Sequence, residues 1–299
     1  MTTTVPSSTP RPAGAELTVA TPEVAAPRKP HSILVRLSYL WLGLIVLLAV
    51  FAQLLPLSDY SVQVGPPRQP PQSGDLDLLL GTDNLGRSLL ARGISGAQVS
   101  LVVGVVACLT GLVVGSVLGM LAGYFGKWVD WTLSLLADAM LAFPPLILLL
   151  ALSAILTPSM RTIMIGLSLL AIPTFFRLAR ANTLTWSQRE FVRAARNMGA
   201  SNFRILVKEI LPNVLPTLAA YLPVVIAAVI VAEGSLSFLG LGIPPPRPSW
   251  GGMVSGGKDF LADTPHLVVV PSLFIFFTVF ALNQAGDHLR ARFDKTMRD

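Results

Sequence analysis

Long apolar runs separated by short polar stretches dominate this chain. An α-helix rises about 1.5 Å per residue, so about 20 apolar residues cross the roughly 30 Å of hydrocarbon in a bilayer. Six runs approach or exceed that length, and we expect membrane-spanning helices at 33–55, 99–124, 131–156, 162–180, 212–238 and 266–286. The pattern therefore predicts an all-α polytopic membrane protein.

Prolines interrupt several of these runs. Proline removes a backbone donor and clashes with the preceding turn, so Phe143-Pro144-Pro145 predicts a kink in the third run. The same is expected along the fifth run, at Pro212, Pro216 and Pro223. The run 162–180 is the weakest of the six, because Pro173 interrupts it. Such bends would let helices splay and shape a cavity.

Composition supports a membrane protein. Of the 299 residues, 53% are apolar and only 13% are charged, with a mean hydropathy of +0.66. A soluble domain carries about a quarter charged residues. The single cysteine, Cys108, lies in an apolar run, so the chain can form no internal disulfide and no cysteine-based metal site. The first 30 residues are rich in Thr, Pro, Ser and Ala and are expected to be disordered.

The distribution of basic residues predicts an orientation. With the N-terminus in the cytoplasm and six alternating helices, six of the 22 Lys and Arg residues face outward. These six are Arg68, Arg87, Arg92, Arg161, Arg247 and Lys258. Cytoplasmic loops are enriched in Lys and Arg, so both termini are expected in the cytoplasm. In a membrane protein the location of Lys and Arg is more informative than their sum, so the net charge of +6 does not indicate nucleic-acid binding.

The same orientation places a polar, basic segment, 187–212, in the cytoplasm. Ser187 and Glu190 have the spacing of a capping box, which predicts a short helix carrying Phe191, Ala194 and Ala195. Gly199 suits a break that needs a positive φ, and Ser201 can cap a second short helix running toward Pro212. We expect two short helices at nearly a right angle, forming a knob that another protein can grip.

Small residues recur along the second apolar run. Ala107, Gly111, Gly115, Gly119 and Gly123 are each four residues apart, so they share one helix face. Such a face lets a neighbouring helix approach closely. We interpret the stripe as helix packing; lining a wide path for a substrate is the alternative.

Two carboxylates, Asp138 and Glu233, lie in or at the ends of apolar runs. A charge at the bilayer centre costs roughly 2.5 to 3.5 kcal/mol on insertion scales, so such groups face a partner or water. For Asp138 a polar contact in a path and a structural partner are equally compatible with the sequence. Glu233 begins a serine-rich turn before Gly240, which favours a role at a gate or helix end.

The sequence gives no support for an enzyme. It contains no Gly-x4-Gly-Lys-Ser/Thr loop, so the chain is expected to bind no nucleotide by itself. Its three histidines have no metal-ligand spacing, and no nucleophile and base arrangement stands out.

The basic segment resembles the "EAA" loop of ABC-importer permeases. The family pattern is Glu-Ala-Ala-x3-Gly-x9-Ile-x-Leu-Pro, and Ala194, Ala195, Gly199, Leu211 and Pro212 fall at its positions. Arg193 stands where the family has Glu, and Glu209 where it has Ile. A salt bridge from that Glu is therefore not expected, whereas the shape made by the alanines and glycine is kept. Arginines of the segment would then contact acidic groups on an ATPase.

Further motifs resemble the DppC/OppC subunits of dipeptide and oligopeptide ABC importers over about residues 33 to 295. They are Gly81-Thr-Asp-Asn-Leu-Gly-Arg87, Ala142-Phe-Pro144, Ala200-Ser201, Leu211-Pro-Asn213, Ser235-Leu-Ser-Phe-Leu-Gly-Leu-Gly242, Pro248-Ser-Trp-Gly251 and Gly286-Asp287. The resemblance implies the type I ABC importer (MetI-like) permease fold in the plasma or inner membrane. It also implies a related second permease, ABC ATPases as subunits or one fused chain, and an extracytoplasmic peptide-binding protein.

That resemblance assigns roles to residues and cofactors. ATP and Mg²⁺ would act on the partner ATPases, and this chain would carry no cofactor. Coupling to the ATPases would use Glu190, Phe191, Arg193, Ala194, Ala195, Gly199, Ala200 and Ser201. Packing or path residues would be Gly111, Gly115, Gly119, Asp138, Pro144 and Glu233. Two outer loops are candidates for docking the binding protein, through Asp83 and Arg87 or through Pro248 and Trp250, and a simple interfacial cap is the alternative for the second loop.

The expected organisation has four parts. A disordered cytoplasmic tail, 1–30, precedes a first helix and outer segment, 31–97. A five-helix core, 98–286, contains coupling helices at 187–212, and a basic cytoplasmic tail follows at 287–299. Alternatives to peptide import are the import of nickel, glutathione or another small solute, and a membrane scaffold without transport activity.

Overall fold

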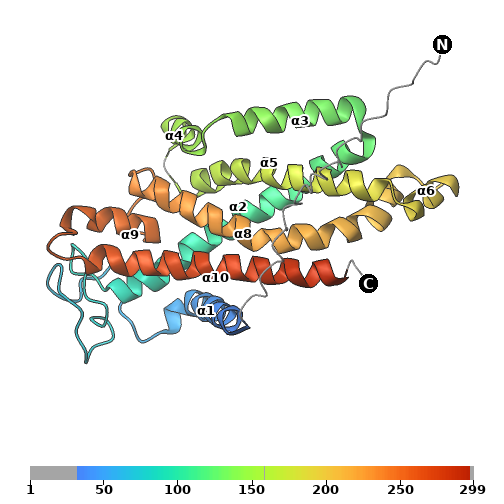
Figure 1. The fold of residues 1–299 in the computed structure, drawn as a ribbon. Coiled ribbons are helices and arrows are strands. Elements are labelled where there is room, and N and C mark those ends of the chain that lie inside the picture. The colour runs from blue at the N-terminus through green and yellow to red at the C-terminus, as the bar shows by residue number, and fades with distance from the viewer. Residues whose placement is uncertain (1–31, 158, 297–299) are drawn as a thin grey trace, which may run out of the picture.

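The computed structural model describes residues 32–157 and 159–296, and within these ranges all the regular elements are helices, apart from two isolated β-bridges in a long loop, 55–88 (Figure 1). The predicted disordered tail, 1–30, lies outside the described residues. The main helices are α1 (Ser32–Val50), α2 (Leu89–Phe125), α3 (Lys127–Ala142), α4 (Pro145–Ile155), α5 (Met160–Ser187), α6 (Glu190–Asn197), α7 (Asn202–Arg204), α8 (Leu211–Phe238), α9 (Trp250–Gly257) and α10 (His266–Thr296).

Five of the six predicted spans are matched by continuous helical segments. The described ranges contain five segments long and apolar enough to cross a membrane, and α3 with α4 would make a sixth. The first, second, fourth, fifth and sixth predicted runs correspond to α1, α2, α5, α7 through α8, and α10. The all-α fold is confirmed.

The third predicted span is not one helix. α3 and α4 meet at an angle of 86°. Phe143 ends α3 with extended backbone, at ψ 126°, which is the conformation that a following proline imposes. Pro144 is extended as well, and Pro145 occupies the first turn of α4, where its missing N–H costs nothing. The expected kink is therefore a complete break.

The isolated prolines of the fourth and fifth predicted runs lie within continuous helices. α5 continues through Pro173 and ends only at Ser187, well past the predicted end at 180. α8 contains Pro216 and Pro223 without a break. The chain therefore breaks at the adjacent prolines 144 and 145 and passes through the isolated ones.

The glycine stripe of α2 packs against α5. A Cβ built on Gly115 would lie 2.4 Å from the carbonyl oxygen of Ile172, and one on Gly119 would lie 2.4 Å from that of Phe176. Gly111 and Gly123 meet α5 in the same way, against Ala171 and Arg180. Backbone therefore touches backbone along this interface, as expected for a face of small residues.

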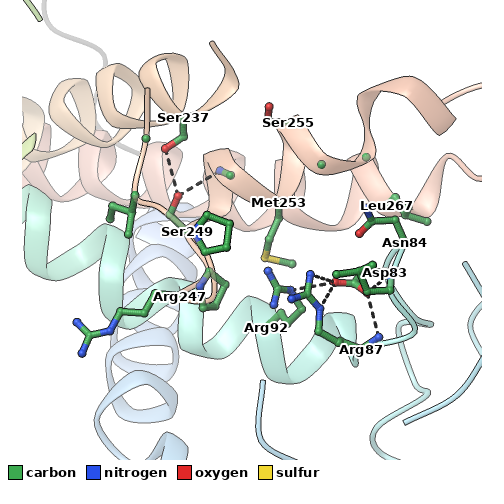
Figure 2. A pocket seen from close by; sticks show the side chains of 18 of the residues that line it. Asp83, Asn84, Arg87, Arg92, Ser237, Arg247, Ser249, Met253, Ser255 and Leu267 are labelled. Atoms are coloured by element: carbon green, nitrogen blue, oxygen red, sulfur yellow. Dashed lines mark hydrogen bonds and ion pairs between the residues drawn. The ribbon is translucent and has the colours of Figure 1, made fainter. Parts of the chain in front are cut away.

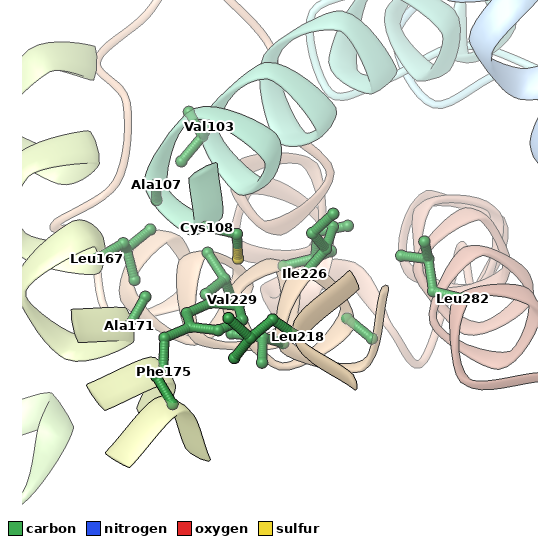
Figure 3. Packing of buried hydrophobic residues seen from close by; sticks show 14 of the residues in the cluster. Val103, Ala107, Cys108, Leu167, Ala171, Phe175, Leu218, Ile226, Val229 and Leu282 are labelled. Atoms are coloured by element: carbon green, nitrogen blue, oxygen red, sulfur yellow. The ribbon is translucent and has the colours of Figure 1, made fainter. Parts of the chain in front are cut away.

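The largest hydrophobic core lies between α2, α5 and α8 (Figure 3). Val103 and Cys108 from α2, Leu167 and Phe175 from α5, and Val229 from α8 are buried there. Cys108 is a free cysteine that is buried in this core, so its side chain packs as a small hydrophobic residue.

The C-terminal helix joins this core to α1. α10 packs against α8, α1 and α9. The indole Nε1 of Trp41 in α1 donates to the hydroxyl of Thr278 in α10 at 3.1 Å. α10 remains helical to Thr296, so most of the segment predicted as a basic tail, 287–299, is the last part of a long helix.

Candidate functional site

The basic segment 187–212 lies at one end of the bundle, opposite α9 (Figure 1). α6 begins there at Glu190, but the predicted capping box is wrong. The Ser187 hydroxyl donates to the carbonyl of Leu184 within α5, at 3.0 Å. Arg189 is the N-terminal cap of α6 and makes no side-chain capping bond. Ser187 therefore closes the preceding helix and does not open the next one.

The break after α6 has the predicted form. Gly199 has a φ of +81°, which an L-residue rarely adopts. The N–H groups of Met198 and Ala200 donate to the carbonyls of Ala194 and Ala195. Ser201 then caps the next helix, since its hydroxyl accepts a bond from the Arg204 N–H at 3.4 Å.

The second helix of the predicted pair is not short. α7 passes into a π-helical turn, η2 (Ile205–Ile210), and this turn passes directly into α8. Together they form one helical segment of 37 residues from Asn202 to Phe238. The π turn lies just before Pro212, which has no N–H to contribute to a regular ladder. The knob is therefore the short helix α6 packed on the beginning of a membrane-spanning helix.

Buried side chains hold α6 on that beginning. Val192 and Ala195 are buried on α6, and they share one hydrophobic cluster with Ile205, Leu206 and Ile210 of η2. Ala195 is small enough to allow close packing, whereas Ala194 is exposed on the opposite side of α6. Of the two alanines of the motif, one faces the core and the other faces outward.

Aromatic residues fasten the knob to two other helices. The Tyr124 hydroxyl, at the end of α2, donates to the Asn202 side chain at 2.9 Å, and the Arg196 guanidinium lies 5.4 Å from the Tyr124 ring. At the end of α5, the Trp186 ring lies 6.2 Å from Phe191. The position of α6 therefore depends on α2, α5 and α8 together.

The outward side of the knob combines apolar and cationic side chains. Met198 and Phe203 are 81% and 77% exposed, and Phe191 is 40% exposed. We call this set the tip surface: Glu190, Phe191, Arg193, Ala194, Arg196, Met198, Ser201, Phe203 and Arg204, all exposed. Large exposed apolar side chains beside arginines are typical of a protein–protein interface.

At the opposite end, the segment Gly81–Arg87 forms a tight turn ahead of α2. The Asp83 carboxylate accepts bonds from the backbone N–H groups of Leu85 and Arg87, at 2.8 and 2.9 Å. It also pairs with the guanidinium of Arg87 at 2.7 Å and with that of Arg92 at 3.3 Å. Arg92 donates further to the Tyr60 carbonyl at 3.1 Å. One carboxylate thus ties the outer loop to the first turn of α2.

A buried carboxylate links three helices at this same end. Glu233 of α8 is 1% exposed and accepts bonds from Ser237 at 2.7 Å and from Ser100 of α2 at 3.3 Å. The Ser237 hydroxyl also lies 3.3 Å from that of Ser249, which caps α9. Glu233 is therefore surrounded by hydroxyl groups and has no access to water in this conformation.

Trp250 completes this junction. It is fully buried, its indole donates to the Gly93 carbonyl at 2.9 Å, and its ring stacks on Phe274 of α10. A Cβ on Gly96 would lie 3.1 Å from the Trp250 ring, so a small residue is required there. α9 is held in place by its own first residue.

These positions change the prediction for the outer loops. Asp83, Pro248 and Trp250 are buried and Arg87 is half-buried, so three of the four predicted docking side chains are not available for a direct contact. Exposed residues of these loops include Asn84, Leu85 and 244–247, none of which was a predicted docking residue. Asn84 and Leu85 lie within the Gly81–Arg87 motif, but nothing in the sequence distinguishes their exposed side chains from the buried one of Asp83.

The two predicted outer loops border a cavity of about 590 Å³. Figure 2 shows Asp83, Arg87 and Arg92 on one side of it, with Met253 and Ser249 facing them from the α9 segment. The Arg247 side chain points away from this group in the same view.

Asp138 has a partner on a neighbouring helix. Its carboxylate lies 2.7 Å from the guanidinium of Arg177 in α5, and both side chains are exposed, by 62% and 58%. Asp130 pairs with Arg180 one level nearer the start of α3. The two charged residues that end the predicted fourth span therefore pair with acids of α3. Within the described ranges, no group of three His, Cys, Asp or Glu side chains could hold a metal ion.

The helical bundle and its long apolar helices define an integral membrane protein. The chain belongs to the family of binding-protein-dependent transport system inner membrane components, which matches residues 115–299. The MetI-like fold is shown by two inward-facing structures of the MetNI methionine ABC transporter. They align with TM-scores of 0.55 and 0.57 at 19% identity, covering 66% and 68% of this chain and 94% and 97% of theirs.

Named relatives match most of the chain. The glutathione transport system permease protein GsiD of Pectobacterium atrosepticum is 38% identical over 219 residues, covering 73% of both proteins. The dipeptide transport system permease protein DppC of Alkalihalophilus pseudofirmus is 36% identical over 253 residues, covering 85% of this chain and 83% of the relative. A putative peptide transport system permease protein of Brucella suis is 39% identical over 230 residues, covering 77% and 76%. The DppC/OppC-type resemblance is confirmed.

Proposed function

We propose that this chain is the permease subunit of an ATP-driven, binding-protein-dependent importer of di- or oligopeptides. The observation that carries the proposal is family membership combined with relatives named for dipeptide, glutathione and peptide transport. Glutathione is itself a tripeptide, so the three relatives share one chemical class of cargo. No observation on the described residues favours nickel.

The proposed coupling site is the tip surface. Its exposed Phe191, Met198 and Phe203 would enter a groove on an ABC ATPase, and its arginines would meet acidic groups there. Closure of the ATPases would then move α6, and the helices packed on it would tilt with it. The chain would supply half of the path, with a related second permease supplying the other half.

The proposed orientation has both termini in the cytoplasm. It is supported by the bias of Lys and Arg residues, and it puts the tip surface on the side where ATP is available. The cavity between the outer loops would then face the extracytoplasmic binding protein. Fluorescent-protein and alkaline-phosphatase fusions after Thr296 test this: fluorescence without phosphatase activity is expected, and the reverse result contradicts the orientation.

Uptake by a strain lacking this chain tests the transport function. Loss of labelled dipeptide uptake, restored by the wild-type chain, is the expected result. The same strain is tested for glutathione and for nickel uptake. Normal uptake of di- and oligopeptides in the deletion strain would overturn the peptide assignment. Loss of glutathione uptake alone would move the cargo to that tripeptide.

A further inference from the structure

The cavity between the outer loops holds an excess of positive charge. Arg87 and Arg92 both pair with the carboxylate of Asp83, so the three side chains together carry one net positive charge. Asp83 is the only acid among the residues lining the cavity. Its oxygens already accept two backbone N–H groups and both guanidinium groups. A second carboxylate is therefore the natural partner for the remaining guanidinium donors.

The groups are recessed and fixed in position. The side chains of Arg87 and Arg92 are only 15% and 10% exposed, and Arg92 is held from behind by the Tyr60 carbonyl. Two guanidinium groups held by one buried carboxylate lose little freedom when a ligand binds, which favours recognition of a planar anion.

The remaining walls suit a small zwitterionic or acidic molecule with apolar side groups. Asn84 offers an exposed polar side chain and Ser255 a half-buried one, while Ile243, Pro244 and Met253 offer apolar surface. The volume of about 590 Å³ lies within the range of sites for small molecules. The chemistry points to a molecule that ends in a carboxylate and carries a variable side chain.

We propose that this cavity is an outer subsite that binds the C-terminal carboxylate of the peptide cargo through Arg87 and Arg92. The inference rests on the proposed function and deepens it, because it places the cargo on this subunit before it enters the path. The recessed position of the guanidinium groups favours a small ligand over a side chain on the surface of the binding protein.

The test uses the complete purified transporter in lipid vesicles, with its binding protein saturated by one of two probes. The probes are alanyl-alanine and its C-terminal amide. In Arg87→Gln, uptake of the free dipeptide is expected to fall about tenfold, which corresponds to the loss of one charged hydrogen bond, while amide uptake stays unchanged. The wild type and Arg87→Gln receive each probe from the same binding protein. Its preference between the two probes therefore affects both transporters equally. Equal losses for the two probes, or no loss, overturn the proposal.

Two further variants test whether a loss of uptake comes from the missing arginine charge in the cavity or from a disturbed loop. Arg68→Gln removes an exposed arginine of the same outer segment, which lies over the Phe260 ring outside the cavity, and is expected to match the wild type. Gly256 lines the cavity and nothing lies within 4 Å of its Cβ position, so Gly256→Trp adds a large side chain at the cavity wall. Gly256→Trp should reduce dipeptide uptake. Wild-type uptake in Gly256→Trp overturns the proposal.

The source of the carboxylate is tested by measuring binding of the peptide-free binding protein to the transporter. Equal affinity for the wild type and Arg87→Gln is expected. A weaker affinity for Arg87→Gln would assign the carboxylate to the binding protein and overturn the proposal. If the wild-type transporter takes up neither probe, the proposed function falls; if all variants take up both probes normally, only the cavity inference falls.

Discussion

The carboxylate of Glu233 and the hydroxyl of Ser237 lie one helical turn apart on α8 and are joined by a hydrogen bond of 2.7 Å. The same carboxylate reaches Ser100 of α2, and Ser237 reaches the cap of α9. Glu233 therefore acts as a connection between three helices at the end of the bundle opposite the tip surface.

Glu233→Ala should lower stability more than Glu233→Gln. Alanine removes the acceptor of two buried hydroxyls, and each buried polar group left without a partner costs about 1–3 kcal/mol. Glutamine keeps an acceptor of the same shape. Thermal unfolding of the detergent-extracted protein should show a clear loss for Glu233→Ala and a smaller one for Glu233→Gln.

Peptide uptake by these variants separates structure from gating. A Glu233→Gln protein that is stable and inserted but does not transport would support a role at a gate. Normal uptake by that variant would restrict Glu233 to holding the helices together. Ser100→Ala, which removes one donor to Glu233 and an acceptor of the Trp250 N–H, is the matched control and should change stability less than Glu233→Ala.

Gly115→Ala should destabilise the protein by about 1–3 kcal/mol, the usual cost of overpacking. The added methyl group would lie 2.4 Å from the Ile172 carbonyl oxygen, and backbone cannot give way as a flexible side chain does. Gly43→Ala in α1 is the control, since nothing lies within 4 Å of its Cβ position. Melting curves of the two purified variants decide this prediction, and equal melting temperatures would contradict it.

Gly199→Pro should abolish uptake while the chain still inserts. Proline fixes φ near −65°, whereas Gly199 has a φ of +81°, so the path of the chain after α6 must change. Ala195→Trp should do the same, because Ala195 is buried against the start of α8. Uptake and ATP hydrolysis by the purified transporter are measured together, and loss of their coupling is expected.

Gly199→Asn is the control for the conformation of this position. Asparagine tolerates a positive φ better than other L-residues, so this variant should keep much of the transport activity. ATP-driven uptake that survives both Gly199→Pro and Ala195→Trp would contradict the coupling role of the tip surface.

Asp138→Asn should reduce the amount of folded protein in the membrane. The change leaves the Arg177 guanidinium without the carboxylate that now lies 2.7 Å away, and an unpaired charge in an apolar surrounding is costly. The double variant Asp138→Asn with Arg177→Gln removes both charges and should recover part of the loss. Membrane levels measured by immunoblotting would show this pattern; a double variant worse than either single one would argue against the pair.

The sequence predicted best those features that depend only on residues close together in the chain. Hydropathy located the long helices, and the positive φ of Gly199 and the cap at Ser201 followed from residue type and spacing. The same local rule failed at Ser187, because a serine hydroxyl can bond to a carbonyl three residues earlier as well as to an N–H three residues later. Spacing along the chain does not select between the two.

Contacts between distant segments were beyond sequence reasoning. Ser100 and Glu233 are 133 residues apart, and Arg177 and Asp138 are 39 apart. The hydropathy of one segment does not indicate which distant segment it will contact. For the same reason the burial of Asp83 and Trp250 could not be foreseen, since a charged residue and an aromatic residue in a polar loop are usually expected at the surface.

The glycine stripe has a consequence for the transport cycle. Each of Gly111, Gly115, Gly119 and Gly123 sits against backbone or β-carbon atoms of α5, so sliding α2 along α5 by even part of a turn would drive bulkier neighbouring residues into the same spaces. α2 and α5 are therefore expected to move together as one rigid body. A change of shape in the subunit is then expected outside this pair, for example at the extended backbone of Phe143 and Pro144 between α3 and α4.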